Sequence, residues 1–525
     1  MKNNTKTVTI SETEYNNLQA ECSSLKQQVE LLMEHLKLSK HKQFGASSEK
    51  SEYDGTQLNI FNEAETEADK TVAEPELVEI EKHYRKSKRL TKDRLPENLP
   101  VETIEYKLSD EERICPTPDC GTLRHIMGEN VRYELKIIPQ QVIIVEHKEY
   151  VYACRPCEAK AEPVPIIKAK APEPVIFKSF ASPEAIAHIM CQKFVMGVPL
   201  YRQEQEFNRN GIMLSRQTMS NWLIRATEDW LEPIYDKLHK LLLARNVLHA
   251  DESTLQVLRE TGKAAKSKSF MWLYRTSGDT EHPIVLYEYQ PGRHAKYPKE
   301  FLAGFEGYLH TDGYDGYHKL PENIAVVGCW AHARRYFDEA LKVLPPEAKV
   351  GSKELIGKQY CNELFALEKE FAELSAEERF KERQERSKPI LDAFFAWAES
   401  VQNLPQSLFG KAIGYALSQR KYLERYLLDG RLEISNNRAE RSIKPFVIGR
   451  KNWLFNNTPK GAKASAIMYS IIETAKENGL NPFDYLVHIF KTAPNLTAEQ
   501  LVSAESLLPW SSEIPSTVRV QKAAS

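Results

Sequence analysis

The sequence predicts a multidomain protein with an α/β core, an all-α insertion inside that core, and several small modules in front of it. Three patterns carry this prediction: short apolar runs typical of buried strands at 246–328, a helical pattern at 352–428, and a heptad repeat with paired cysteines further upstream. At 525 residues the chain is too long for one core, so we expect three or more domains.

The composition is that of a globular protein, with 42% apolar and 27% charged residues. No apolar run approaches about 18 residues, and the N-terminus lacks a hydrophobic signal segment, so we expect a cytoplasmic protein with no membrane partner. The net charge of −2 hides a segregation of charge along the chain. Residues 63–81 contain eight acids and one lysine, whereas 431–463 contain eight Lys/Arg and two acids. The second segment predicts a basic face that binds nucleic acid.

Residues 1–45 predict a coiled-coil helix. Ser11 and Glu14 form a capping-box pattern that begins a helix over 11–43. Apolar side chains fill two alternating seams at seven-residue spacing, namely Leu18, Leu25 and Leu32 in one and Tyr15, Cys22, Val29 and Leu36 in the other. We interpret the stripe as a contact that makes a homodimer or higher oligomer. The alternative is a helix that packs on its own protein's core.

Residues 46–100 have the composition of a charged linker, and 101–170 predict a small β module with a structural zinc site. The zinc prediction rests on two close cysteine pairs, whose four thiolates complete a tetrahedral shell: Cys115, Cys120, Cys154 and Cys157. Strands are expected at 134–145 and 149–153, and folding should depend on the metal. The other cysteines are isolated and are predicted to be buried small hydrophobes: Cys22, Cys191, Cys329 and Cys361.

Residues 171–243 predict a helical, helix-turn-helix-like domain that binds DNA. Pro183 begins one helix, and a break at Gly211 separates helices at 200–208 and 215–228. The polar face of the last helix is free to enter a groove and carries Arg216, Gln217, Asn221 and Arg225. An ordinary antiparallel helix pair is the alternative.

The catalytic core is expected in two parts, 244–345 and 431–490, which flank the helical insertion at 346–430 and precede a C-terminal tail at 491–525. Strands are predicted at 247–254, 256–259, 270–275, 283–289, 307–311 and 323–328, with helices at 293–304 and 331–343. This order places Asp251 on the first strand and Asp312 just after a parallel neighbour. The two carboxylates should therefore lie close enough to share a metal.

A third carboxylate is expected on the helix after the insertion, where Glu433 and Glu440 compete. Carboxylates on neighbouring strands and a facing helix can hold two divalent metals against a scissile phosphate, and oxygen ligands favour Mg²⁺ (or Mn²⁺). Asn436, Asn437 and Glu440 share one helix face, so the asparagines can orient the carboxylate or a phosphate. Glu252 points to the other side of its strand and is not expected to bind the metal.

Basic side chains surround this predicted site and suggest phosphate contacts. They are Arg334 and Arg335, next to His332, and then Arg438, Arg441, Lys444, Arg450 and Lys451, with Asn437 among them. Trp453 and Phe455 suit stacking on an unpaired base, or the core. Structural ion pairs are the alternative for the arginines. Cys329 and His332 alone are too few ligands for a second metal site.

The sequence segments around these residues resemble those of the transposases of insertion-sequence family 66, a branch of the DDE transposases. The similar segments are 44–50, the cysteine module, His249–Glu252, Thr311–Tyr314, Cys329–Arg335, Asn436–Arg441 and Ile448–Phe455. The resemblance implies a ribonuclease-H-like core, with Asp251, Asp312 and Glu440 catalytic, that cleaves and joins DNA at the ends of an insertion sequence. It also implies a bacterial, nucleoid-associated protein and, as partners, transposon ends, target DNA and small companion proteins of the same element. A catalytically inactive DNA-binding regulator of transposon ends is the main alternative.

Overall fold

The computed structural model describes residues 11–44, 141–152, 167–278 and 280–520, together with isolated positions between 103 and 126. The chain divides into two compact units, one formed by 1–49 with 172–520 and the other by 50–171 with 521–525. In the second unit, β1 (Val151–Tyr152) pairs antiparallel with β2 (Ile167–Lys168). No strand covers 141–145, so the predicted strand at 134–145 is wrong at its described end. The four cysteines of the predicted zinc site lie outside the described residues.

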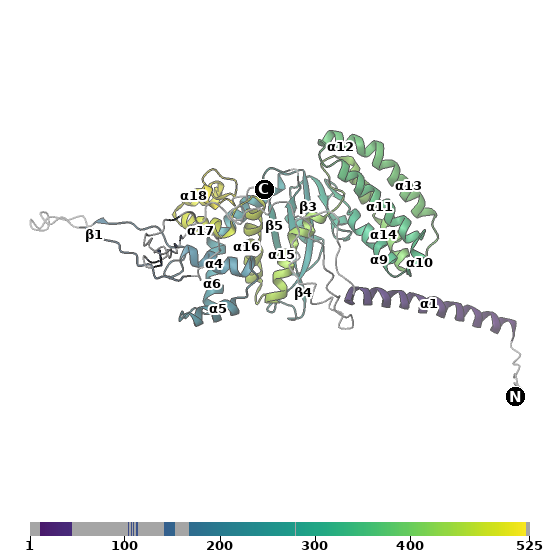
Figure 1. Ribbon diagram of the computed structural model, residues 1–525, viewed down its shortest axis with the longest axis horizontal. Helices are drawn as coiled ribbons and strands as arrows, with labels where there is room; N and C mark the ends of the chain where they lie inside the picture. The colour runs from purple at the N-terminus through teal and green to yellow at the C-terminus, as the bar shows by residue number, and fades with distance from the viewer. Residues whose placement is uncertain are drawn as a thin grey trace, which may run out of the picture. The chain divides into compact units, whose positions relative to one another are not determined.

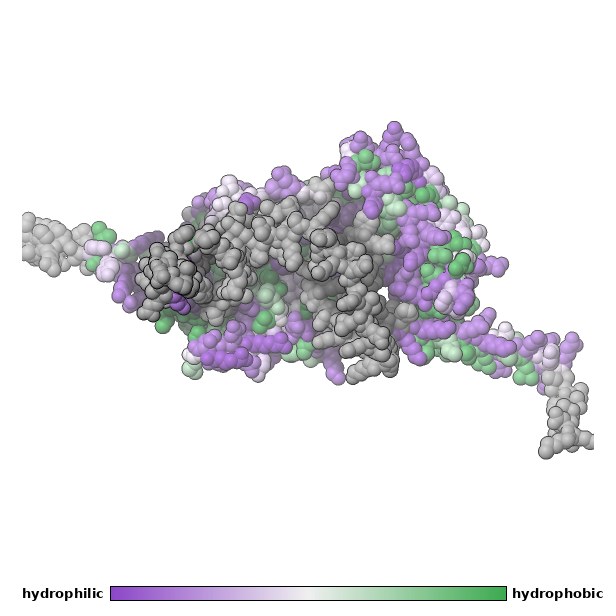
Figure 2. Space-filling model, in the orientation of Figure 1, coloured by the Kyte–Doolittle hydropathy of each residue, from purple (hydrophilic) through white to green (hydrophobic). Residues whose placement is uncertain are grey.

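The N-terminal helix α1 spans Glu12–Phe44. The predicted capping box is confirmed, because Ser11 N–H donates to Glu14 Oε2 (3.1 Å) and Glu14 N–H donates to Ser11 Oγ (3.2 Å). The apolar stripe remains exposed along the helix, and Figure 2 shows hydrophobic side chains there among hydrophilic ones. Cys22 is exposed as well, so its predicted burial is wrong for the single chain. Only near its end does α1 join a core of the described residues, through Leu38.

The helical domain follows the predicted order. Ser182 caps α4 (Pro183–Phe194), and α5 (Leu200–Arg209) is separated by the Gly211 turn from α6 (Arg216–Ala226), which Ser215 caps. Gly211 has a φ of +75°, a left-handed conformation that glycine adopts without steric cost. A π-helical turn at Thr227–Leu231 leads into α7 (Glu232–Leu243). Met219, Trp222 and Leu223 join the main core, as predicted.

A mixed five-stranded sheet, in the order β5-β4-β3-β6-β7, forms the centre of this unit (Figure 1). Its strands are β3 (Val247–Gln256), β4 (Lys268–Thr276), β5 (Val285–Gln290), β6 (Gly307–His310) and β7 (Ile324–Val327). The β3–β4 and β4–β5 pairs are antiparallel, whereas β3–β6 and β6–β7 are parallel. The short α8 (Lys296–Phe301) lies in the crossover from β5 to β6. The separate strand predicted at 256–259 is wrong: β3 runs on to Gln256, and Val257 forms only an isolated bridge with Asn456.

Two helices after the insertion pack on the sheet. α15 (Asn437–Trp453) contacts β3 and β4, and α16 (Pro459–Glu477) contacts β5 (Figure 1). Because β5 is an edge strand, it has backbone groups without a strand partner. Hydroxyl groups of α16 accept hydrogen bonds from this edge. Val285 N–H donates to Thr474 Oγ1 (3.0 Å) and Tyr287 N–H donates to Ser470 Oγ (2.7 Å). α17 (Pro482–Thr492), α18 (Ala498–Ser503) and the buried Leu507, Ile514 and Val518 complete the same core.

The insertion is entirely helical and builds a second hydrophobic core with the helix that precedes it. α9 (Trp330–Lys342) leads into α10 (Pro346–Lys349), α11 (Lys353–Glu370), α12 (Ala376–Glu382), α13 (Lys388–Ser400) and α14 (Leu408–Leu423). Trp330, Phe337 and Phe394 are among its buried side chains. The all-α insertion predicted from the sequence is therefore present. No helix of the described residues is long and apolar enough to cross a membrane.

Candidate functional site

The three predicted carboxylates come from three elements of one unit. Asp251 lies inside β3, Asp312 follows β6 by two residues, and Glu440 lies in the first turn of α15. β3 and β6 are adjacent and parallel, and their register pairs His249 with His310, so Asp251 and Asp312 each lie two residues beyond the last paired position. The side chains are held locally, since Asp251 Oδ1 accepts from Glu252 N–H (2.8 Å) and Asp312 Oδ1 accepts from Tyr314 N–H (2.9 Å).

These carboxylates influence one another's ionisation. Burial raises the pKa of Asp251 well above its usual value, and the nearby charges of Glu252, Asp312 and Glu440 raise it further. Such a cluster of like charges is unfavourable in the folded chain alone. A divalent cation would remove the repulsion, and an all-oxygen ligand set suits a hard ion such as Mg²⁺. The residues present therefore fit the metals that a site of this kind requires.

Glu252 is close to the cluster, but its oxygens are already occupied. Arg293 Nε donates to Glu252 Oε1 (2.7 Å), and the Tyr317 hydroxyl donates to Glu252 Oε2 (2.6 Å). Arg293 also lies 3.9 Å from Asp312 Oδ2, and its guanidinium sits over the Tyr314 ring, 3.8 Å from the centroid. These contacts support the expectation that Glu252 does not bind the metal, but Arg293 contacts both Glu252 and Asp312, so Glu252 lies closer to the cluster than its place on the strand predicted.

Glu440 faces the N-terminal part of α9. His332 Nε2 lies 3.7 Å from Glu440 Oε1, and Arg335 Nη2 lies 3.6 Å from Glu440 Oε2. Among the described residues, Glu440 Oε1 is buried without a hydrogen-bond partner, as expected for an oxygen that binds a cation. The sulfur of Cys329 and the ligand atoms of His332 and Glu440 all lie within 4.8 Å of one another. The fold thus places Glu440 beside the Cys/His pair, although Cys329 Sγ already accepts a hydrogen bond from Asn436 N–H.

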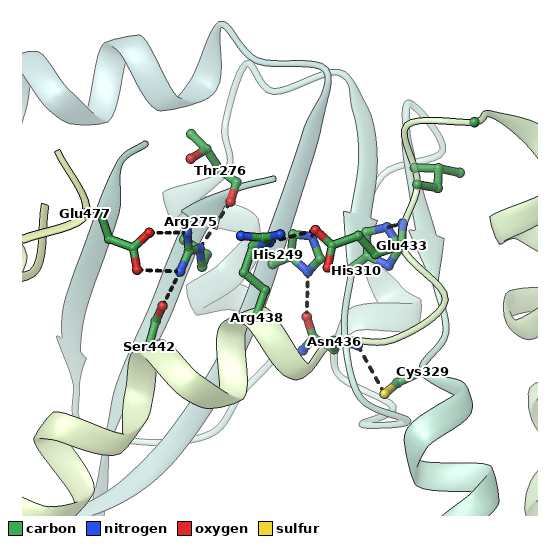
Figure 3. A network of polar contacts seen from close by, with 12 residues as sticks. His249, Arg275, Thr276, His310, Cys329, Glu433, Asn436, Arg438, Ser442 and Glu477 are labelled. Atoms are coloured by element: carbon green, nitrogen blue, oxygen red, sulfur yellow. Dashed lines mark hydrogen bonds and ion pairs between the residues drawn. The ribbon is translucent and has the colours of Figure 1, made fainter. Parts of the chain in front are cut away.

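Glu433, the competing carboxylate, belongs to a different network. Its Oε1 accepts from Arg438 Nε (2.6 Å) and lies 3.8 Å from His249 Nε2, as Figure 3 shows. Its backbone N–H donates to His310 Nε2 (3.2 Å). These partners engage Glu433 in a network of its own. Its engagement there supports Glu440 as the third ligand.

Asn436 lies at the centre of this network and joins three elements (Figure 3). Its Nδ2 donates to the Ala250 carbonyl (2.8 Å), its Oδ1 accepts from His249 Nδ1 (3.0 Å), and its N–H donates to Cys329 Sγ (3.2 Å). Burial lowers the pKa of His249 to about 3, so this ring is neutral and can stack on His310, with centroids 4.4 Å apart. The Asn436 carbonyl accepts from Glu440 N–H (3.2 Å). Asn436 therefore orients the carboxylate through the backbone, not through a side-chain contact.

The predicted DNA-contacting residues near the site divide into three groups. Arg441, Lys444 and Lys451 are exposed on α15, as a phosphate-binding face requires. Arg438 and Arg450 instead make internal contacts, the first with Glu433 and the second with Thr254 Oγ1 (2.8 Å). The remaining members are half-buried: Arg334, Arg335 and Asn437. Their role in DNA binding stays a prediction.

On α6 the four predicted DNA-reading side chains are all exposed: Arg216, Gln217, Asn221 and Arg225. Gln217 Nε2 donates to Asn221 Oδ1 (3.1 Å), and Arg225 lies 3.4 Å from Asp229. The exposed face is free to enter a groove, as the helix-turn-helix interpretation requires.

A mixed sheet with acidic residues on its central strands and on the following helix is the arrangement of a DDE-type catalytic domain. Comparison with known families agrees, because the profile of the transposase IS66 family matches residues 178–464, more than half of the chain. The chain belongs to the IS66 family of transposases. Three further profiles match, described as the transposase C of IS166 homeodomain at 31–104, the zinc-finger binding domain of transposase IS66 at 112–158, and the IS66 C-terminal element at 470–510.

Similar proteins of Sinorhizobium fredii cover most of the chain. The protein y4qI is 31% identical over 81% of this chain and 78% of its own length. The protein y4jD is 31% identical over 79% of this chain and 81% of its own length. Both are described as uncharacterized, so they add no activity.

Several residues around the site escaped the sequence analysis. Arg293 and Tyr317 hold Glu252, and Tyr415 of α14 packs against Gly313, the residue after Asp312. Their positions depend on long-range packing, for which the sequence has no local pattern. The doubled asparagine drew attention to Asn436, but its side chain bonds to β3 and not to Glu440, and its predicted orienting role stays a prediction.

The like charges near Asp251 lead to a testable prediction about the stability of the fold. Because its pKa is higher in the folded protein than the usual value of about 4, its ionisation at neutral pH destabilises the folded state. We expect Asp251→Asn to raise the midpoint of thermal unfolding of metal-free protein at pH 7 by about 2–4 °C, equivalent to ~1 kcal/mol. It should also reduce the increase in the midpoint that Mg²⁺ produces in the wild type.

Asp338→Asn is the matched control. Although Asp338 is partly buried, Lys342 and Lys358 lower its pKa, so its charge stabilises the fold. This variant should lower the midpoint and leave the Mg²⁺ effect intact. An Asp251→Asn midpoint at or below that of the wild type would contradict the account of crowded carboxylates.

Proposed function

We propose that this transposase performs Mg²⁺- or Mn²⁺-dependent cleavage and strand transfer at the ends of an insertion sequence, with Asp251, Asp312 and Glu440 as the metal ligands. The observation that supports the proposal is that these three carboxylates lie near one another, since the charges of Asp312 and Glu440 both raise the pKa of Asp251. The alternative of a catalytically inactive DNA-binding regulator leaves this unfavourable cluster without a purpose.

The chemistry follows from the ligand set. Two metals bound there would activate the attacking oxygen and stabilise the leaving oxygen of an in-line displacement at phosphorus. In cleavage, water attacks the phosphodiester and the 3′ oxygen leaves as a free hydroxyl. In strand transfer, that hydroxyl attacks a phosphodiester of the target, and a new 3′ hydroxyl leaves, so no covalent enzyme–DNA intermediate forms.

The chain's own residues position the DNA for these steps. Arg335 beside Glu440 and Arg293 beside Asp312 place guanidinium groups at the edge of the acidic cluster, where they can bind phosphate oxygens. The exposed Arg441, Lys444 and Lys451 extend this positive surface along α15. The polar face of α6 would read the sequence of the transposon end.

Two further assignments belong to this proposal. The first is a structural Zn²⁺ held by Cys115, Cys120, Cys154 and Cys157, supported by the zinc-finger profile that spans all four. The second is self-association through α1, supported by the exposed heptad stripe. A dimer would allow one complex to hold both ends of the element.

Variants of two glutamates, Glu433 and Glu440, test which side chain is the third metal ligand. We expect Glu440→Gln to abolish Mg²⁺-dependent cleavage of an end fragment, because a neutral amide is a poor ligand for the metal. Asp251→Asn and Asp312→Asn should do the same, and affinity for the end should remain within a few-fold of the wild type in all three. The measurement is strand cleavage on a denaturing gel beside a binding isotherm.

Glu433→Gln is the matched control, since it changes the same side chain seven residues earlier. It weakens the contacts with Arg438 and His249 and should lower stability while cleavage continues. Loss of cleavage in Glu433→Gln with retention in Glu440→Gln would reassign the ligand. A wild-type protein that binds ends but never cuts or joins them, with companion proteins present, would support the regulator instead.

The zinc assignment is tested on the full chain. We expect one tightly bound Zn²⁺ per chain by elemental analysis, and none in the Cys154→Ser/Cys157→Ser double variant, because two ligands cannot complete a tetrahedral shell. Cys191→Ser/Cys361→Ser is the control and should keep the metal. A full chain without zinc, or a double variant that retains it, would refute the assignment.

The role of α1 is tested by placing charge on its stripe. Leu25→Asp/Leu32→Asp would bring four carboxylates into the apolar seam of a dimer, which should cost several kcal/mol of association free energy. We expect light scattering to show a smaller assembly and paired-end complexes to disappear, while single-end binding persists. Lys26→Asp/Lys37→Asp, off the stripe, controls for added acidity. An unchanged mass for the seam variant would place self-association elsewhere.

A further inference from the structure

An open pocket of about 470 Å³ lies between α9 and α14, at the junction of the catalytic core and the insertion. Its lining includes Tyr336 from α9, Asn403 from the loop before α14, and Gly414 and Tyr415 from α14. None of these residues has a part in the metal site or in the predicted DNA-binding surfaces. The pocket therefore needs an explanation of its own.

The pocket borders the acidic cluster directly. A Cβ atom added to Gly313, next to Asp312, would lie 2.8 Å from Cε2 of the Tyr415 ring, so this ring packs against the backbone that carries the carboxylate. Burial raises the pKa of Tyr415, and the charges of Cys329 and Asp312 raise it further, so it remains a neutral phenol. The inner wall of the pocket and the predicted metal site thus share one segment of chain.

The pocket walls suit a flat aromatic ligand. The rings of Tyr336 and Tyr415 lie with centroids 4.8 Å apart at an interplanar angle of 34°. Tyr336 is 37% exposed, so it offers ring surface to a ligand. Asn403 adds an amide that can both donate and accept hydrogen bonds. Gly414 leaves the helix surface open, because a Cβ atom built there would meet nothing within 4 Å.

We propose that this pocket holds one unstacked nucleobase of the DNA strand beside the scissile phosphate. The inference rests on the proposed function, since it requires that DNA be cleaved at the adjacent acids. Aromatic side chains stack on any base, and an amide can contact the base edge, so the lining matches a nucleobase. Turning one base out of the stack would draw its phosphate towards Asp312 and Glu440, where duplex stacking otherwise restricts the backbone.

The first experiment removes the exposed ring. Tyr336→Ala should lower the cleavage rate at saturating end DNA about ten-fold, the effect expected for one lost base–aromatic stack. The dissociation constant of the end should change less than two-fold, because in the bound complex the gain from this stack is largely offset by the cost of unstacking the base from the duplex. Phe380→Ala is the matched control, since Phe380 is similarly exposed (42%) on α12 of the insertion but does not line the pocket. It should leave the rate unchanged.

The second experiment removes the base instead. End fragments with a single abasic nucleotide at successive positions around the scissile phosphate are cleaved by wild type and by Tyr336→Ala. At the position whose base the pocket holds, the two proteins should cleave at equal rates, because the stacking partner is absent for both. If no position equalises the rates, the pocket does not bind a base. If the wild type cleaves no fragment at all, the proposed function fails instead.

A third variant guards against a folding artefact. Gly414→Leu replaces a helical glycine with a better helix former in open space, so it should fold at least as well as the wild type while filling the pocket. We expect it to cleave as slowly as Tyr336→Ala and to abolish the fluorescence increase of 2-aminopurine placed at the captured position. Lys421→Leu, exposed on the same helix and outside the pocket, should behave as the wild type. Normal cleavage by Gly414→Leu would overturn the proposal.

Discussion

The buried amide of Asn436 is the contact on which the geometry of the site depends. It ties the start of α15 to β3 through bonds to Ala250 and His249, and the backbone N–H of the same residue bonds to Cys329 at the start of α9. The strand carries Asp251, and the helix that follows Asn436 carries Glu440. A single uncharged residue therefore links the strand that carries one carboxylate to the helix that carries the other. Its own burial is tolerated because both ends of the amide are hydrogen-bonded.

Much of the fold was predictable because local patterns specify it. The capping boxes, the apolar strands with their turns, and the helical stripes of the insertion each depend on neighbours a few residues away. The proximity of Asp251 and Asp312 was predictable as well, since β3 and β6 are parallel neighbours and each acid lies two residues after a paired position. The separate strand at 256–259 was wrong because the apolar pattern gave no sign that β3 runs on without a break to Gln256.

The remaining features depend on contacts between distant segments. Whether Glu433 or Glu440 faces the acids is decided by His249, His310 and Arg438, which come from three different places in the sequence. In the sequence, all basic residues of α15 were equally good candidates for DNA contacts. In the structure, Arg450 bonds to β3, whereas its neighbour Lys451 is exposed. The pocket beside Gly313 arises only when the insertion packs on the core. No local periodicity contains this information.

The position of Glu440 after a long helical insertion also affects when activity can arise. The ribosome delivers Asp251 and Asp312 first, and the sheet strands that carry them can pair before α15 has been made. The third carboxylate emerges only after the whole insertion has been synthesised, and it is held in place by Asn436 four residues ahead of it. A nascent or prematurely ended chain would thus have the α6 face that we propose reads DNA but would lack one of the three proposed metal ligands, so it could bind DNA ends without cutting them.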